Sequence, residues 1–139
     1  NLENFGTDID GSLGTVPGLD PTNPAASAMA KIGEANGFAG GDAFVGESYD
    51  AAALMLLAMA SAKSSDPQVY KDHIMKVANG TGEKIYPGEL AKGIKLASYG
   101  VAIDYVGASS VSLIGPGEAA GNFREIQIQN GKMVDVNYR

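Results

Sequence analysis

The chain has 139 residues, enough for one domain, and its 16 acidic and 10 basic residues give a formal net charge of -6 at pH 7. This acidic balance argues against nucleic acid and against an anionic membrane surface as partners. The absence of cysteine excludes disulfides and thiolate metal sites, and no apolar run is long enough for membrane insertion.

The N-terminal part of the sequence predicts a short strand followed by a helix. Residues 12–16 read as an extended segment. Asn23 is a favourable N-cap and Pro24 suits the first position of a helix, so we expect a helix from there to about Glu34. The Asn36-Gly37 pair that follows is typical of a helix C-terminus.

The most informative segment is FVGESYDAAALMLLAMASA, residues 44–62. Residues 43–45 predict the end of a buried strand, which passes through a short polar stretch into a helix. That helix is almost wholly apolar over residues 51–60, and a helix that is apolar on all sides is expected to be buried on all sides. The rest of the chain offers too few elements to bury it, so the sequence predicts part of a larger fold.

Two further helices are predicted in the middle of the chain. Asp66 is the expected N-cap of the first, and an apolar stripe at helical spacing follows it. A polar loop over residues 80–84 leads to a second helix over residues 87–98, in which Gly93 lowers the helix propensity. Residues 103–106 fit either a short strand or a turn of helix.

The C-terminal sequence predicts a β-hairpin. Residues 123–129 alternate between polar and apolar side chains, with Ile126 and Ile128 on one face, and Val134, Val136 and Tyr138 alternate again. The Asn130-Gly131 pair between them is a strong signal for a two-residue turn. The order of strands and helices along the whole chain favours an α/β fold with right-handed crossovers.

Four stretches of the sequence together resemble a known protein family. They are GSLGTVP at 11–17, AFVGESYDAAALMLLAMASA at 43–62, IDYVGASS at 103–110 and FREIQIQNGKMVDV at 123–136. In this order and spacing they resemble the C-terminal part of the type I periplasmic substrate-binding proteins of branched-chain amino acid (Leu/Ile/Val-type) ABC transporters. Ser110 departs from the pattern, because glycine is usual at that position of the family.

The resemblance implies part of a two-lobed periplasmic-binding-protein type I fold, with a mostly parallel sheet, flanking helices and a C-terminal β-hairpin. Residues 1–16 would be the end of a second-lobe segment and a hinge strand, and residues 17–110 would be part of the first lobe. Residues 111–139 would be the return hinge and the second-lobe hairpin. Because family members are more than twice as long, the resemblance also implies a missing N-terminal part of the same protein or a self-associated copy.

The function that the resemblance implies is that of a periplasmic or extracellular bacterial solute-binding protein. It would close its lobes on a branched-chain amino acid, an amide or a similar small molecule and deliver it to an ABC permease. Two alternatives stay open. The chain could be a ligand-sensing domain of the same fold that acts on a signalling partner, or a structural α/β domain without a ligand.

Four residues before the apolar run are candidate ligand contacts. Phe44 occupies the family position that looks most like a cleft wall, although it could equally be a core aromatic. Glu47 could accept an ammonium group or act as a cap, and Ser48 could bind a carboxylate, although a helix N-cap is favoured for it. Tyr49 could form a lid or pack within the lobe. Asp50 is expected to be a helix-start residue that offsets the helix dipole, not a ligand contact.

The sequence offers little catalytic chemistry. It contains one histidine, His73, and no cysteine, which makes catalytic triads of the common kinds improbable. Residues 80–84 lack the spacing of a phosphate-binding loop, and residues 107–111 lack the second glycine of a nucleophile elbow. We therefore expect a non-enzymatic protein that requires no cofactor and no metal.

Overall fold

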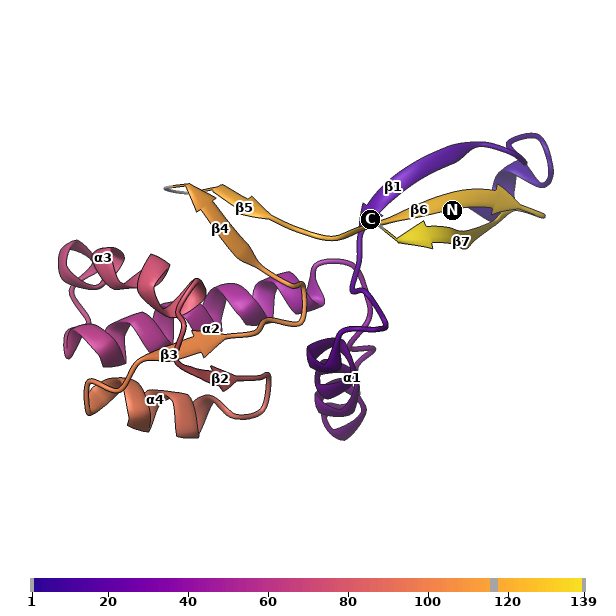
Figure 1. Cartoon of the computed structure of the whole chain (residues 1–139). Coiled ribbons are helices and arrows are strands. Elements are labelled where there is room, and N and C mark those ends of the chain that lie inside the picture. The colour runs from indigo at the N-terminus through magenta and orange to yellow at the C-terminus, as the bar shows by residue number, and fades with distance from the viewer. Residues whose placement is uncertain (1, 116–117, 139) are drawn as a thin grey trace.

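The computed structural model describes residues 2–115 and 118–138 (Figure 1). The helices are η1 (Leu2–Phe5), α1 (Pro24–Asn36), α2 (Val45–Ala62), α3 (Pro67–Ala78) and α4 (Leu90–Ser98). The strands are β1 (Leu13–Pro17), β2 (Glu83–Ile85), β3 (Ile103–Tyr105), β4 (Ser112–Gly115), β5 (Glu118–Ala120), β6 (Phe123–Gln129) and β7 (Lys132–Tyr138). Within these residues, no helix has both the length and the apolar character that crossing a membrane requires.

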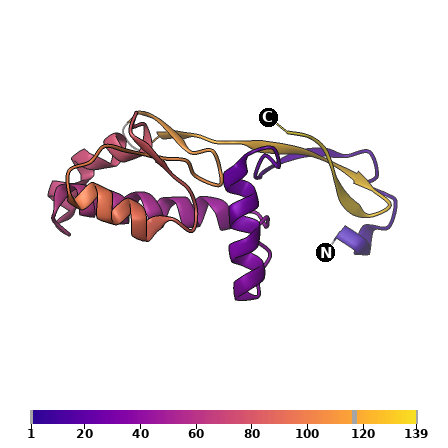
Figure 2. The ribbon, with the colours of Figure 1, turned by 60° about the horizontal axis from the view of Figure 1, so that its bottom comes forward.

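The elements form two bodies joined by two connections (Figure 1). The helical body contains α2, α3 and α4, the parallel pair β2–β3 and the antiparallel pair β4–β5. The end sheet is antiparallel, has the order β1–β6–β7 and extends away from the helical body. The chain passes between the bodies after β1 and again between β5 and β6, while α1 projects away from the other elements (Figure 2).

Several local signals in the sequence produce the elements that they predict. The Asn23 side chain accepts a hydrogen bond from the Ala25 amide at 2.9 Å and so caps α1, which ends at Gly37 in the left-handed region. Asp66 caps α3 in the same way. The C-terminal hairpin forms over the predicted residues, and both turn residues, Asn130 and Gly131, have positive φ angles. These predictions are confirmed because each depends on contacts within a few residues.

The predicted strand over residues 43–45 is wrong. Phe44 is the residue that precedes α2, with a φ of 67°, and the helix already begins at Val45. The polar stretch that includes Glu47 therefore belongs to the first turn of the helix and not to a connection. The strand prediction fails because no neighbouring strand pairs with these residues, so the apolar pair Phe44 and Val45 simply starts the helix.

Helix α2 is also not buried on all sides. Leu54 and Leu57 face the core, but Met55 and Leu56 are 42% and 45% exposed. The predicted lack of cover over this helix is therefore real within this chain, although it is confined to one side of the helix.

The middle of the chain differs from the prediction in one strand and one helix end. The expected polar loop over residues 80–84 contains the start of β2, which pairs in parallel with β3 and buries Ile85 completely. The ambiguous residues 103–106 are thereby assigned to a strand. Helix α4 starts at Leu90, later than expected, because Gly88 has a φ of 90° that a right-handed helix cannot include.

The core of the helical body lies where α2 packs against α3, α4 and the β2–β3 pair. Leu57, Ile85 and Tyr105 are the largest of its fully buried side chains, and each is at most 1% exposed. Gly93 lets α4 approach this core closely, because a Cβ atom there would lie 2.8 Å from Leu57 Cδ2 and 2.9 Å from Ile85 Cγ2. The glycine that weakens the helix in the sequence is thus required by packing.

Candidate functional site

The candidate site is built around Asp50, in the second turn of α2. Its side chain is 1% exposed, yet four donors surround it. The Tyr105 hydroxyl donates to Oδ1 at 2.7 Å and the Ala108 amide donates to Oδ1 at 3.0 Å. The Ser109 amide and hydroxyl donate to Oδ2 at 2.8 and 2.6 Å. The expectation that Asp50 serves the helix start is therefore wrong, because it instead fixes the loop that follows β3.

The burial of this cluster affects the acid–base chemistry of Tyr105. Burial disfavours the charged phenolate, and the nearby Asp50 carboxylate disfavours it further, so the pKa of Tyr105 lies well above its ordinary value. The hydroxyl therefore stays protonated and remains a donor to Asp50. Gly107 completes the arrangement, because any Cβ atom at that position would collide with the Asp50 carboxylate.

A groove of about 340 Å³ opens beside this cluster, between α2 and the β4–β5 pair. Most of its wall is apolar and includes Ala51, Leu54, Val111, Leu113 and Phe123. Pro17, at the end of β1, and residues 121–123, at the start of β6, also line it. The groove therefore lies at the junction of the helical body with both connections to the end sheet.

Glu47 is the predicted contact that lines this groove. It is half-buried in the first turn of α2, and none of the described residues forms a hydrogen bond or ion pair with its carboxylate. Asp50 also lines the groove, but its two oxygens are already occupied by four donors. No basic side chain of the described residues lines the groove, so its charge is negative.

The other three candidate contacts lie differently. Phe44 is 60% exposed at the start of α2, three positions before Glu47, and is not a core aromatic in this chain. Ser48 is exposed and is not the N-cap, because Phe44 occupies that position. The Tyr49 hydroxyl accepts a hydrogen bond from the Gly88 amide at 3.0 Å, which holds the ring against the helical body. Of the four candidate contacts, the structure places only Glu47 in the wall of the groove, and the Tyr49 hydroxyl is directed to Gly88.

Sequence patterns alone do not identify Ser109, Val111 or Phe123 as groove residues. Ser109 belongs to the Gly-Ala-Ser loop, which carries part of the family resemblance. That resemblance is the one sequence signal that could have pointed to Ser109. The alternating pattern places Phe123 on a strand. Its position in the groove wall depends on how the chain returns to the end sheet, which the pattern does not predict.

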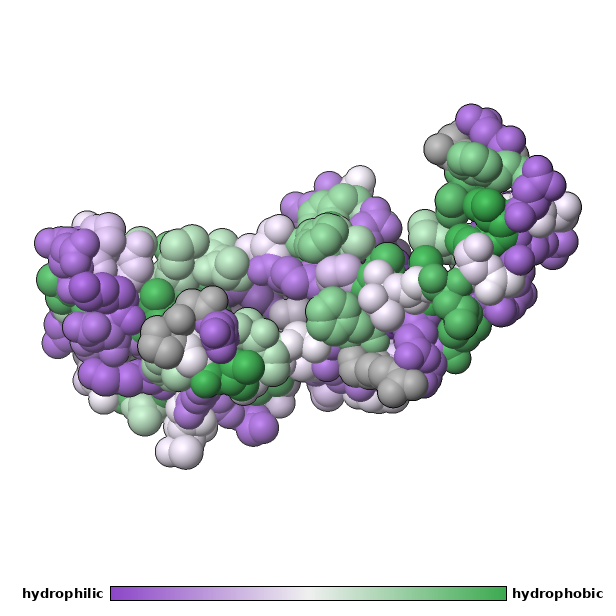
Figure 3. Space-filling view, turned by 90° about the horizontal axis from the view of Figure 1, so that it is seen from above, coloured by the Kyte–Doolittle hydropathy of each residue, from purple (hydrophilic) through white to green (hydrophobic). Residues whose placement is uncertain are grey.

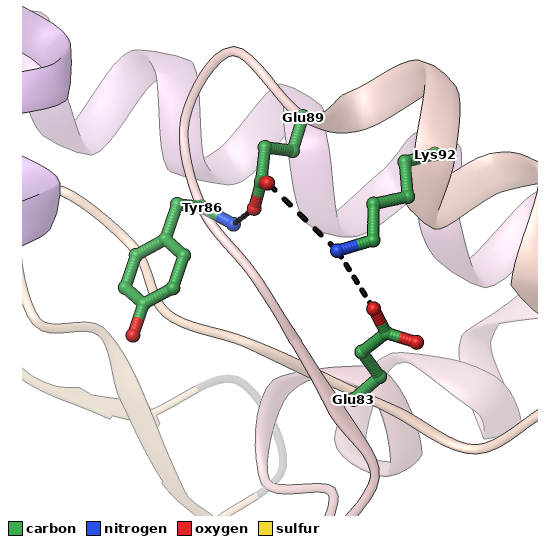
Figure 4. A network of polar contacts seen from close by, with 4 residues as sticks. All are labelled: Glu83, Tyr86, Glu89 and Lys92. Carbon is green, nitrogen blue, oxygen red and sulfur yellow. Dashed lines mark hydrogen bonds and ion pairs between the residues drawn. The ribbon is translucent and has the colours of Figure 1, made fainter.

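A second polar cluster lies away from the groove, between β2 and α4 (Figure 4). Lys92 Nζ lies 2.7 Å from Glu83 and 3.8 Å from Glu89, and Glu89 accepts the Tyr86 amide at 3.0 Å. The hydrogen bond to Glu83 raises the pKa of Lys92. All three charged side chains are nearly half exposed, so these ion pairs contribute little to stability and serve to connect β2 with the start of α4. The described residues contain no group of acidic or histidine side chains arranged for a metal ion.

Comparison with known proteins adds one solved structure. No protein-family model and no curated protein sequence matches the chain. The chain is similar to the crystal structure of the leucine-binding protein LivK from Thermotoga maritima MSB8, with a TM-score of 0.60 and 20% sequence identity. The match covers 99% of this chain and 33% of that chain, so this chain spans about a third of that protein's length. The chain therefore has the α/β fold of part of a type I periplasmic binding protein.

Proposed function

We propose that this chain forms part of a solute-binding protein that takes up a branched-chain amino acid, an amide or a similar small molecule. The observation that carries the proposal is the groove beside Asp50, which combines apolar walls with the unpaired carboxylate of Glu47. It occurs in a fold similar to that of a protein described as leucine-binding.

The chemistry of the groove suits the aliphatic side chain and the ammonium or amide group of such a ligand. Its apolar wall can cover an aliphatic side chain, and Glu47 can accept hydrogen bonds from an ammonium or amide group. A volume of about 340 Å³ lies at the small end of ligand sites in proteins. Among the described lining residues Asn122 offers an amide donor but no side chain is basic, so a positively charged partner for the carboxylate of an amino acid would have to come from polypeptide outside this chain.

The exposed surface supports the need for further polypeptide. The chain exposes 8040 Å², whereas a compact monomer of its mass exposes about 6,800 Å². The difference exceeds the roughly 800 Å² that each partner buries in an ordinary interface. Apolar surface is visible along the end sheet (Figure 3), which exposes Leu13, Met133 and Val136, in addition to Met55 and Leu56 on α2. We infer that the rest of a longer protein, or a second copy, covers part of these faces.

The wider role follows from the family resemblance alone. In this proposal the protein works in the periplasm or outside a bacterial cell and closes its two lobes on the solute. The closed and open forms then differ in their affinity for an ABC permease, and this difference allows delivery.

Substitution of Phe44, the residue that the family resemblance assigns to the cleft wall, tests the proposal. Phe44→Ala in the intact protein should weaken leucine binding about tenfold or more, because burying a phenylalanine ring is worth about 1.5–3 kcal/mol. Its free energy of unfolding should fall by less than about 1 kcal/mol, since the ring is largely exposed in this chain. Isothermal titration and urea unfolding provide the two values, with Tyr99→Ala, at an exposed aromatic residue outside the groove, as the matched control. Unchanged binding with a large loss of stability would instead make Phe44 a core residue.

A further inference from the structure

Helix α1 is attached to the rest of the molecule through a small number of contacts. It projects from the layer that contains the other elements (Figure 2). Its buried face packs mainly on the loop that follows it, because Gly33 lies against the backbone of residues 38–40 and Gly40 lies against the backbone of Met29. Ile32 lies near Gly88 of the helical body, and the start of the helix provides side-chain hydrogen bonds to that body.

The side chain of Asn23 provides these hydrogen bonds. Its Oδ1 caps α1, as described above, while its Nδ2 faces the loop of residues 107–110. Nδ2 donates to the Gly107 carbonyl at 3.2 Å and to the Ser110 hydroxyl at 2.8 Å. One amide group thus connects two segments that lie more than 80 residues apart in the chain.

The loop that Asn23 holds is itself fixed to α2. Asp50 binds the amides of Ala108 and Ser109 on one side, and Asn23 binds the carbonyl of Gly107 on the other. Ser110 has a φ of 54°, a conformation that favours glycine, and its hydroxyl accepts the bond from Asn23. The serine that replaces the usual glycine of the family thus gains a specific contact with the start of α1.

On its other side, α1 is separated from the end sheet by a hollow of about 270 Å³. Ala26, Ser27 and Ala30 of the helix form one wall, and Arg124 and Tyr138 of the end sheet form another. Two bodies joined by two connections and a small interface are expected to move relative to each other. The hollow leaves room for such movement, whereas the contacts of Asn23 do not.

We propose that Asn23 is a latch that makes α1 move with the helical body when the two bodies bend relative to each other. Bending then takes place where the end sheet ends, at residues 17–18 and 121–122. The hollow beside Arg124 widens or narrows with this bending, while α1 keeps its position on the loop of residues 107–110. The proposal concerns motion within the chain and does not depend on which solute is bound.

Asn23→Ser separates the latch from the cap. Serine is as good an N-cap as asparagine but is too short to reach the loop, so α1 should remain helical and lose its connection. Ser110→Ala removes one of the three bonds that Nδ2 donates to this loop, the others being to the Gly107 and Ala108 carbonyls, and should have a smaller effect in the same direction. Asn36→Ser, at the other end of α1, is the matched control because its amide bonds only within the helix.

Distances between pairs of nitroxide labels in the intact protein test the latch. Because the chain contains no cysteine, labels can be placed at the exposed positions Lys31 on α1, Lys71 on α3 and Lys132 on β7. With Asn23 present, the 31–71 distance distribution should be narrow and the 71–132 distribution broader.

In Asn23→Ser the 31–71 distribution should broaden, while circular dichroism shows an unchanged helix content. A 31–71 distribution that stays narrow in Asn23→Ser would overturn the proposal. An equally broad 31–71 distribution in the protein with Asn23 would also overturn it. If the serine variant does not fold, the milder Ser110→Ala variant provides the same comparison.

Discussion

At the scale of single residues, the groove depends on a carboxylate that does not face the solute. Asp50 receives four hydrogen bonds from Tyr105, Ala108 and Ser109, and these bonds set the course of the loop beside the groove. A buried carboxylate is tolerated only when its hydrogen-bonding capacity is satisfied. Glu47, one turn earlier on the same helix, has no such partners among the described residues and is free to meet a ligand.

Asp50→Asn should therefore destabilise the protein by about 3 kcal/mol, because an amide NH2 group would face the buried donors of Ser109. Glu47→Gln on the same helix should change the free energy of unfolding by less than about 0.5 kcal/mol. Urea unfolding of both variants measures the difference. Equal and small effects would show that the four bonds do not hold the loop.

Tyr105 adds a pH dependence to the same cluster. Its pKa is raised in the folded protein above the ordinary value of 10.0, so above that pH the unfolded chain loses this proton while the folded protein keeps it. The contribution of Tyr105 to the free energy of unfolding is complete below pH 10. It declines as the pH rises further, by up to about 1.4 kcal/mol per pH unit. Tyr105→Phe should remove this decline, and exposed Tyr99→Phe should retain it in unfolding measurements between pH 9 and 11. The same slope in both variants would contradict this assignment.

The sequence predicted these residue roles only in part. Asn23 and Asp66 were recognised as caps because their partners lie two residues away. Asp50 could not be assigned correctly, since its partners follow it by 55 to 59 positions and only the fold brings them together. The latch contact of Asn23 with Ser110 was missed for the same reason.

At the scale of elements, local chemistry decided where helices and turns occur, and packing decided where strands form. The C-terminal hairpin was predicted over its observed residues from alternation and the Asn130-Gly131 turn. Strand β2 was not predicted, because three residues in a polar context become a strand only when β3 lies beside them. The start of α2 was misplaced because Phe44 and Val45 satisfy the pattern of a strand end without a strand to pair with.

Gly93→Ala compares the energetic cost of overpacking the core with the gain in helix propensity within α4. Alanine favours a helix over glycine by about 1 kcal/mol, but its Cβ atom would press on Leu57 and Ile85. We expect a net loss of about 1–2 kcal/mol, because overpacking a filled core costs more than the propensity gains. Lys95→Ala on the exposed side of α4 is the control, and thermal unfolding compares the two. A stabilising Gly93→Ala substitution would mean that α4 can move away from the core without cost.

At the scale of the whole molecule, the chain combines two bodies, a groove at their junction and more exposed surface than a compact monomer of its mass. The α/β class was predicted from the order of elements and is confirmed by the structure and by its likeness to part of a leucine-binding protein. The boundaries at residues 16–17 and 110–111 remain predictions, as do the transporter role and the location outside the cytoplasm. Each of these depends on contacts with further polypeptide, and a pattern within this sequence does not predict those contacts.

Ligand-induced stabilisation of the intact protein tests the central claim most directly. The measurement is a thermal and chemical unfolding screen against amino acids, amides and aromatic acids. A solute present at 100 times its dissociation constant should raise the free energy of unfolding by about 2.7 kcal/mol. We expect this increase with a branched-chain amino acid or an amide. No stabilisation by any of these compounds would contradict a solute-binding role.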